Sequence, residues 1–360
     1  MPNTTLLCVG SGMAPRYRLN TLQTLAMPYG AHIQFRYSSD LIPDALRKKL
    51  ESTTLKNARV LLGHVDCTKT GRRLNGYCRI TACRFAKLVY SRKVGSVFVL
   101  RFELEDFAIT SDVQRFEESL PSGLPHWQQN GQGEKLEGSW CQEVPPEFEG
   151  CARSNDIDSW QTIVSKLKKC EDFTRQLYYY TVEGLFEGIG KSRVHLRNGE
   201  YVLRSSKDYE LRVFHWDPTA DAHAGHGENQ WLRLDVVEPW LQVRTNPILA
   251  IDSPYDLKSV QIRTGSAVRR EHSSMFLHEG NQGLLSDRIS VELYLPVTIK
   301  GTMGRSVSYG LIVGCLLTAQ QLLAIFSRDH VGPWIPLTIA AAVLGLVTGF
   351  FVAFGMRKPI

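Results

Sequence analysis

Two long uncharged stretches near the C-terminus constrain this chain more than any other feature of its sequence. Residues 307–326 read VSYGLIVGCLLTAQQLLAIF, and residues 333–355 read PWIPLTIAAAVLGLVTGFFVAFG. Each has about the 20 residues that a helix needs to cross the hydrocarbon core of a bilayer, and neither contains a charged side chain. Since only a short polar link separates them, the pattern predicts a transmembrane hairpin.

The cations around these stretches predict the orientation of the hairpin. Lys300 and Arg305 precede the first stretch, Arg357 and Lys358 follow the second, and the link carries Arg328 alone. Cationic residues collect on the cytoplasmic side of membrane proteins. The pattern therefore predicts an inner (plasma) membrane protein whose N-terminal body and C-terminus are both cytoplasmic.

Small residues recur along one face of each stretch. Small side chains let helices in a membrane approach closely, and glutamines there can hydrogen-bond between helices. Two interpretations remain open: the stretches pack only against each other, or they associate with other copies of the chain. The residues predicted to pack in this way are Gly310, Gly314, Gln320, Gln321, Ala341, Gly345, Gly349 and Ala353.

The remainder of the chain has the composition of a folded polar body. At 360 residues it is long enough for two folded units and an additional segment. Its eight cysteines include no CxxC pair, which indicates free thiols in a reducing compartment rather than a disulfide framework. The net charge of +6 bears on attraction to polyanions or membranes, not on the fold.

The first unit, residues 1–120, has the pattern of short strands separated by turn residues, with one helix beginning at Pro43. It is predicted to be a basic β-rich domain in the form of a partly open barrel. The expected strands are residues 31–37, 58–65, 77–82 and 96–104.

Three further segments complete the predicted domain organisation. Residues 121–172 form a linker rich in Pro, Gly, Gln and Glu, followed by an amphipathic helix that Asp158 or Ser159 caps. Residues 173–302 alternate apolar and charged side chains, as in a β-sandwich. Residues 303–360 contain the hairpin. The predicted fold class is mainly β, with two cytoplasmic β-rich domains, barrel-like and then sandwich-like, followed by a C-terminal two-helix transmembrane hairpin.

One basic run has the largest excess of positive over negative side chains in the predicted cytoplasmic body. Between Cys67 and Phe102 the chain carries nine cations and no Asp or Glu. Guanidinium groups can fork onto phosphates, so the run predicts a site for a nucleotide second messenger, nucleic acid or anionic lipid headgroups. The alternative is a solvated face paired with the acidic stretch that follows. The candidate ligand-binding residues are Arg72, Arg73, Arg79, Arg84, Lys87, Arg92 and Lys93.

Two groupings contain residues of the types that bind metals. His64, Cys67, Cys78 and Cys83 suggest zinc, but Cys78 and Cys83 are an odd number of positions apart on an expected strand and would face opposite sides. A second stretch, HWDPTADAHAGHGEN, has the Pro, Gly, Ala and Asp content of a hairpin loop. No metal and no cofactor are therefore expected. The weak metal candidates in that loop are His215, His223 and His226.

The chain contains no GxSxG, HExxH or P-loop motif and no GxGxxG with the right flanks, so no catalytic residue is assigned. In plan, a cytoplasmic β-rich body on a short membrane hairpin is similar to the membrane effectors of bacterial defence systems. In those effectors a signal makes anchored subunits cluster and breach the inner membrane. The similarity covers the layout and no motif, so it transfers no functional residue.

The expected function is a non-enzymatic, membrane-anchored sensor or effector. Its β domains would bind a ligand or partner, and its transmembrane helices would self-associate and disrupt the membrane in a bacterial defence (anti-phage) role. The alternatives are a passive membrane scaffold that recruits a soluble partner and a membrane-tethered hydrolase. The expected partners are membrane lipids, other copies of the chain, and an anionic ligand or a soluble protein, with nucleic acid as a further alternative.

Overall fold

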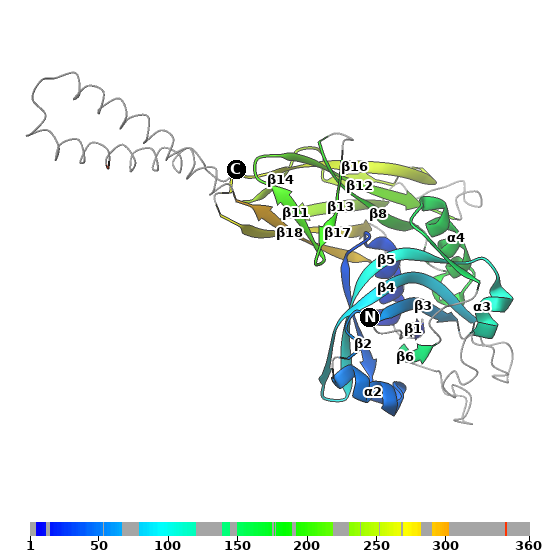
Figure 1. Ribbon diagram of the computed structural model, residues 1–360. Coiled ribbons are helices and arrows are strands. Elements are labelled where there is room, and N and C mark those ends of the chain that lie inside the picture. The colour runs from blue at the N-terminus through cyan, green and yellow to red at the C-terminus, as the bar shows by residue number, and fades with distance from the viewer. Residues whose placement is uncertain are drawn as a thin grey trace, which may run out of the picture.

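The computed structural model of the protein describes residues 5–301 with gaps, together with Val343. The described chain consists of a strongly curved sheet followed by a sandwich of two sheets (Figure 1). The gaps are residues 12–14, 53, 67–78, 120–138, 145–149, 175, 177, 189–191, 219–229, 238, 252, 268 and 282–289.

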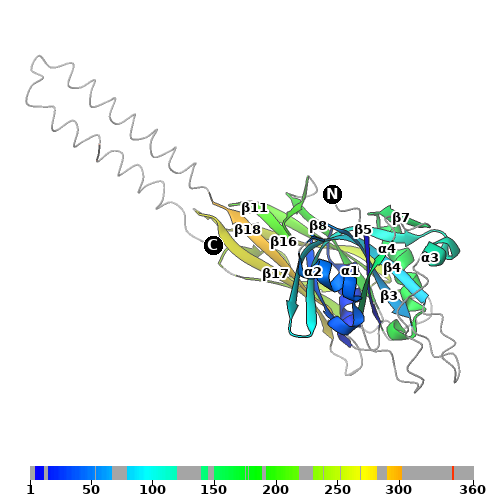
Figure 2. The same cartoon turned by 60° about the horizontal axis from the view of Figure 1, so that its bottom comes forward.

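The first domain is a seven-stranded sheet whose concave side holds the helices α1 (Pro15–Ala26) and α2 (Asp44–Glu51). Its elements are β1 (Thr5–Ser11), α1 (Pro15–Ala26), β2 (His32–Ser38), η1 (Ser39–Leu41), α2 (Asp44–Glu51), β3 (Arg59–Asp66), β4 (Arg79–Val94), β5 (Val97–Thr110), α3 (Val113–Ser119), β6 (Ser139–Val144) and β7 (Cys151–Ser154). The strand order is β2-β5-β4-β3-β1-β6, and β7 also pairs with β5. Because β4 and β5 curve around α1 and α2, the sheet forms a half-barrel (Figure 2).

The second domain is a sandwich. After α4 (Ile157–Lys168) and the short turn η2 (Glu171–Phe173), its strands are β8 (Tyr179–Glu187), β9 (Ser192–Val194), β10 (Leu196–Arg197), β11 (Glu200–Arg204), β12 (Asp208–Trp216), β13 (Gln230–Val236), β14 (Leu241–Val243), β15 (Ile248–Ala250), β16 (Tyr255–Thr264), β17 (Glu271–Asn281) and β18 (Glu292–Lys300). One sheet has the order β10-β11-β18-β17-β13-β15, and the other has the order β14-β16-β12-β8-β9.

The alternation of side chains explains why these segments form strands. Along β12, Tyr209, Leu211 and Val213 are buried between the sheets, while Glu210 and Arg212 between them are only partly covered. Successive side chains of a strand point to opposite faces, so this pattern buries one face of the strand. The predicted mainly β character, with a barrel-like sheet and a sandwich, is confirmed at this level.

The amphipathic helix expected after the linker is present as α4. Its N-cap is Asp156, whose Oδ1 accepts a hydrogen bond from the backbone N–H of Ser159 at 2.7 Å. This residue, rather than Asp158 or Ser159, is the cap because its backbone is extended, as an N-cap requires. The expected apolar face is buried, namely Trp160, Ile163, Val164 and Leu167.

Trp160 connects the two domains. Its ring is fully buried and meets the rings of Phe214 and Trp216 in the sandwich at centroid distances of 5.7 and 6.3 Å. Its Nε1 donates a hydrogen bond to the carbonyl oxygen of Leu25 in α1 at 3.1 Å. Buried residues of both domains therefore belong to one continuous hydrophobic core.

Arg84 is a charged side chain buried beneath the curved sheet, with 1% of its surface exposed. Its Nε donates to the carbonyl oxygen of Glu105 at 2.7 Å, and its Nη1 donates to those of Thr24 and Met27 at 3.0 and 2.5 Å. Burial lowers its pKa to about 9, so the guanidinium stays charged at neutral pH. Arg84 thus satisfies carbonyls at the end of α1 that the helix leaves without partners.

The predicted transmembrane hairpin and the inner-membrane location that rested on it require correction. Among the residues that the structure describes, no helix is long and apolar enough to cross a membrane. An uncharged run of about 20 residues meets the length requirement for a span but does not by itself establish one. Apart from Val343, the predicted spans 307–326 and 333–355 lie outside the described residues. For the described residues the fold class is therefore corrected to mainly β, and no two-helix transmembrane hairpin is seen among them.

Two strands lie in the segment that the sequence predicted as a linker. β6 pairs with β1 and β7 pairs with β5, so both extend the curved sheet. These strands have only six and four residues, and in the sequence they are surrounded by Pro, Gly and Glu. The first domain consequently uses residues well beyond position 120.

Replacing Arg84 by Met is expected to lower the free energy of unfolding by about 3 kcal/mol. The substitution keeps most of the apolar length of the side chain but leaves three buried carbonyls without a donor. Urea denaturation followed by circular dichroism measures the change. Arg92→Met on the exposed side of the same strand is the control, with an expected change within about 0.5 kcal/mol. Equal losses in the two variants would contradict the role of Arg84.

Candidate functional site

The described members of the basic run do not gather on one surface. Arg84 is buried, Lys87 Nζ lies 2.6 Å from Glu105 Oε1, and Lys93 Nζ lies 2.9 Å from Glu51 Oε1. Arg92 is exposed. The side chain of Arg79 and all of Arg72 and Arg73 lie outside the described residues. The described cations therefore do not build a polyanion site on their own.

The other candidates are placed as follows. His215 is buried, with its Nε2 3.0 Å from the carbonyl oxygen of Ser253. Within the described part of the chain, no group of three or more His, Cys, Asp or Glu side chains could hold a metal ion. The candidates outside the described residues are His223, His226, Gly310, Gly314, Gln320, Gln321, Ala341, Gly345, Gly349 and Ala353.

His64 lies between a carboxylate and a hydroxyl, the same order of groups as in an Asp-His-Ser catalytic triad. Its Nε2 is 3.1 Å from Asp172 Oδ2, and its Nδ1 is 3.5 Å from the hydroxyl of Thr21. However, that hydroxyl also donates to the carbonyl oxygen of Tyr17, and the void beside it has only about 10 Å³. A space that small holds about one water molecule and no substrate. The cluster therefore ties the turn η2 to the first domain.

A larger cavity lies between the two domains. This interdomain cleft has a volume of about 290 Å³, near the lower end of the range for small-molecule pockets. Domain boundaries are among the places where such pockets occur most often. The cleft is lined by Pro28, Tyr29, Asp106 and Asn155 from the first domain and α4 linker, and by Arg193, Val194, His195, Leu196 and Tyr201 from the sandwich.

Two tight turns bring the walls of the cleft together. Gly30 has a φ of +82°, and a side chain there would meet the Cβ of Leu196 at 3.4 Å. Next to it, Ala31 forms a bridge with Gly199, whose φ is +78°. Both glycines adopt a conformation that other residues rarely take, so the sequence holds the turn after α1 close to the β10–β11 hairpin.

Tyr201 contributes a polar group that the fold leaves unused. Its side chain is fully buried on β11, yet its hydroxyl has no hydrogen-bond partner among the described residues. Burial raises its pKa, and the nearby charge of Arg193 opposes part of that effect. The hydroxyl therefore stays protonated at neutral pH. A buried hydroxyl without a partner costs free energy.

Arg193 supplies a positive charge to the same cleft. Its Nη2 donates to the carbonyl oxygen of Glu183 at 2.5 Å, which fixes the guanidinium in place. A guanidinium has five N–H donors, so the group retains donors for a ligand. Arg193 also lies close enough to the buried Arg84 to lower the pKa of that residue, after the larger effect of burial.

The acidic residues near the cleft are partly neutralised. Glu105 forms ion pairs with Lys87 and with Arg153, whose Nη1 lies 2.9 Å from its Oε2. The same nitrogen lies 3.8 Å from Asp106 Oδ2. Burial alone would raise the pKa of Glu105, but hydrogen bonds from Lys87 and Arg153 outweigh it and lower the pKa. The carboxylates of Glu105 and Asp106 are therefore offset by neighbouring cations, and the cleft lining itself carries one acidic residue, Asp106, and one arginine, Arg193.

Sequence patterns did not point to this site. Arg193, His195 and Tyr201 lie on short strands and turns of the sandwich, away from any motif or charge run. Their proximity to Tyr29 and Asp106 arises from how the two domains meet, which no spacing in the sequence encodes. The one available signal was the pair of glycines at positions 30 and 199, each in a tight turn.

No family model and no curated protein matches the chain. Among solved structures, it is similar to the E. coli chaperone DraB, with 14% identity over 29% of this chain and 53% of that chain, at a TM-score of 0.20. It is also similar to tripeptidyl peptidase 2, with 18% identity over 41% of this chain and 11% of that chain, at a TM-score of 0.23. The chain spans about half the length of DraB, and likenesses at such TM-scores carry no argument about function.

The ion pairs of Glu105 predict how stability depends on pH. The folded pKa of Glu105 lies below its ordinary value of 4.5, so the fold favours the ionised form. Its contribution is complete above that value and is lost as pH falls through the lower folded pKa. The difference in unfolding free energy between wild type and Glu105→Gln is therefore expected to be largest near neutral pH and to shrink below about pH 4.

Chemical denaturation at a series of pH values measures this difference. Glu51→Gln, which removes the partner of Lys93 in an exposed ion pair, is the matched control and should change stability little at any pH. A difference for Glu105→Gln that stayed constant across the acidic range would refute the assignment.

Proposed function

We propose that the protein is a non-enzymatic sensor whose interdomain cleft binds a small anionic molecule. The observation that carries the proposal is the presence of Arg193 and Tyr201 together in the cleft lining, where the buried Tyr201 hydroxyl has no partner among the described residues. A hydroxyl donor next to a guanidinium suits a carboxylate or phosphate, because both groups accept several hydrogen bonds at once.

The size of the cleft limits the ligand. A volume of about 290 Å³ suits a molecule of about the size of a nucleoside monophosphate or smaller, and not a folded polymer. This supports the expectation of an anionic ligand and disfavours nucleic acid. The ligand would contact the cleft rather than the basic run, whose described lysines already have carboxylate partners.

A sensing role is supported by the position of the cleft. A ligand held by Arg193 and Tyr201 of the sandwich and by Tyr29 of the first domain would contact both domains together. Such a ligand would stabilise the arrangement of the two domains relative to each other. The membrane-disrupting part of the expected function depended on the hairpin and is not carried forward.

The two alternative functions, a hydrolase and a scaffold, agree less well with the geometry of the cleft. A hydrolase needs a nucleophile and a base with room for a substrate, and the His64 cluster has space for about one water molecule. A scaffold that recruits a soluble partner has no need for a buried hydroxyl without a partner. Neither alternative accounts for the unpaired Tyr201 hydroxyl at the cleft.

Arg193→Gln is expected to weaken binding of a small phosphorylated probe roughly tenfold or more, because a charge-assisted hydrogen bond is lost. The probes are 5′-AMP, inorganic phosphate and, as a neutral comparison, adenosine, and isothermal titration calorimetry measures their affinities. Tyr201→Phe should weaken binding less, since it removes one neutral donor.

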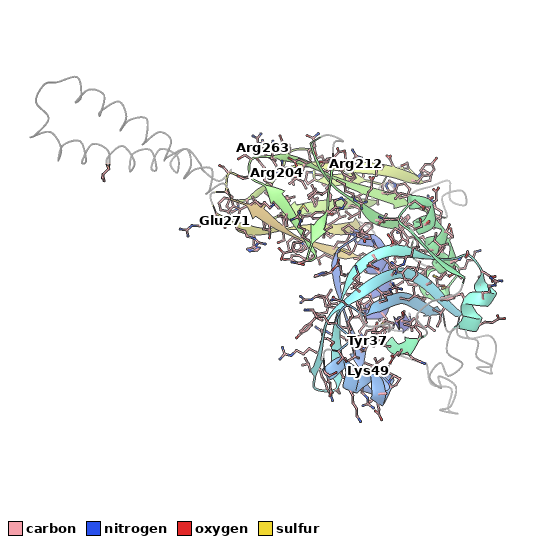
Figure 3. All side chains as sticks on the ribbon, viewed as in Figure 1. Tyr37, Lys49, Arg204, Arg212, Arg263 and Glu271 are labelled. Carbon is pink, nitrogen blue, oxygen red and sulfur yellow. The ribbon has the colours of Figure 1, made fainter. Side chains whose placement is uncertain are left out.

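The control is Arg263→Gln, which removes an exposed arginine on the side of the sandwich away from the first domain (Figure 3). It should bind the probes as wild type does. If neither 5′-AMP nor phosphate bound the wild type, or if Arg193→Gln and Arg263→Gln gave the same affinity, the proposal would be refuted.

A further inference from the structure

Two cysteines face each other inside the first domain. In the antiparallel pairing of β1 with β6, Cys8 lies directly opposite Cys141, and their sulfur atoms are 3.0 Å apart. Opposed residues of an antiparallel pair have Cα atoms about 4.5 to 5.5 Å apart, which lies within the range that disulfides adopt. A bond of about 2.0 Å would therefore need the sulfurs to approach by only about 1 Å.

The other described cysteines lack this arrangement. Cys83 Sγ donates to the carbonyl oxygen of Thr81, and Cys170 Sγ donates to that of Lys166. Cys151 is half-buried at the edge of β7. Within the described part of the chain, Cys8 and Cys141 are thus the pair whose thiols contact each other.

From this register and contact we infer that Cys8 and Cys141 form a reversible disulfide that links β6 to β1. The reaction with a peroxide is balanced: one thiolate attacks a peroxide oxygen to give a sulfenic acid, and the second thiol displaces water from it. The two sulfurs lose two electrons in total, and one hydrogen peroxide yields two molecules of water. A dithiol reductant reverses the step by thiol–disulfide exchange.

The closed fold protects the pair from oxidation. Both side chains are at most 1% exposed, and burial raises the pKa of Cys8 well above its ordinary value. Tyr37, from β2, lies close by in the interior of the domain (Figure 3). Because the thiolate is the reactive form, the thiols react only when the strand that covers them opens.

β6 is the strand that can open. It has six residues, lies at the edge of the sheet and pairs with β1 alone among the described strands. Its side-chain link to α2 is an ion pair in which Lys49 Nζ lies 2.7 Å from Glu143 Oε2. Figure 3 labels Lys49 on α2. Both partners are more than a third exposed, and exposed ion pairs contribute little stability. Oxidation would then link β6 covalently across 133 positions of sequence.

The test treats the full-length reduced protein with hydrogen peroxide and maps its peptides by mass spectrometry without reduction. The expected product is a peptide pair joined through Cys8 and Cys141 that a dithiol reductant separates. Amide hydrogen exchange in β6 should slow in the oxidised protein. Cys8 and Cys141 recovered as unlinked thiols, as sulfinic acids, or joined to other cysteines would overturn the inference.

A second arm tests the route through opening of β6. Lys49→Gln should speed disulfide formation by a factor of about two to five, as expected from loss of an exposed ion pair. Lys93→Gln removes an exposed ion pair with Glu51 of α2, which is not part of β6, and it should leave the rate unchanged. Equal rates in Lys49→Gln and wild type would overturn this route. Both variants keep the two cysteines, so neither depends on tolerating a change in the core.

Discussion

The buried guanidinium of Arg84 is the interaction on which the rest of the first domain depends. It bonds to the end of α1 through the carbonyls of Thr24 and Met27, and to β5 through that of Glu105. The chain that follows Met27 forms the turn with Tyr29, and the residue after Glu105 is Asp106. One side chain therefore fixes the two segments that the first domain contributes to the cleft.

The two domains share a core rather than a flexible joint. Trp160 inserts between α1 and the sandwich, and the His64–Asp172 contact ties down the chain that leads from α4 into β8. Extensive apolar contact between domains restricts their relative motion. The proposed ligand would act on an arrangement that is already well ordered, so its effect would be to stabilise it.

The sequence predicted the repetitive parts of the fold well and the relations between them poorly. Alternation located β12, and helical spacing located the buried face of α4, because both patterns are local. The strands β6 and β7 escaped prediction because each is short and gains its partner from residues far away in the chain. Arg84 was predicted as a ligand-binding cation, yet it is a buried structural group, since charge runs in a sequence do not show which side of a strand each residue occupies.

The uncharged C-terminal stretches illustrate a different limit, since length and hydropathy alone set a condition for crossing a bilayer but do not establish that a segment crosses one. The cleft illustrates a third limit, because Arg193 and Tyr201 form a candidate binding site only together with Tyr29 and Asp106 of the first domain. Such a site arises from the meeting of two surfaces. Apart from the glycines at positions 30 and 199, the sequence pattern of either surface alone contains no sign of the site.

The placement of β1 has a consequence for biosynthesis. β1 lies between β3, to which it runs parallel, and β6, which begins more than 120 residues later. Contacts between residues far apart in sequence form slowly, because a long loop must close first. While the ribosome is still making the intervening chain, one side of β1 has no neighbour. In a nascent chain, β1 would then expose an unpaired edge that a chaperone could cover until β6 is made.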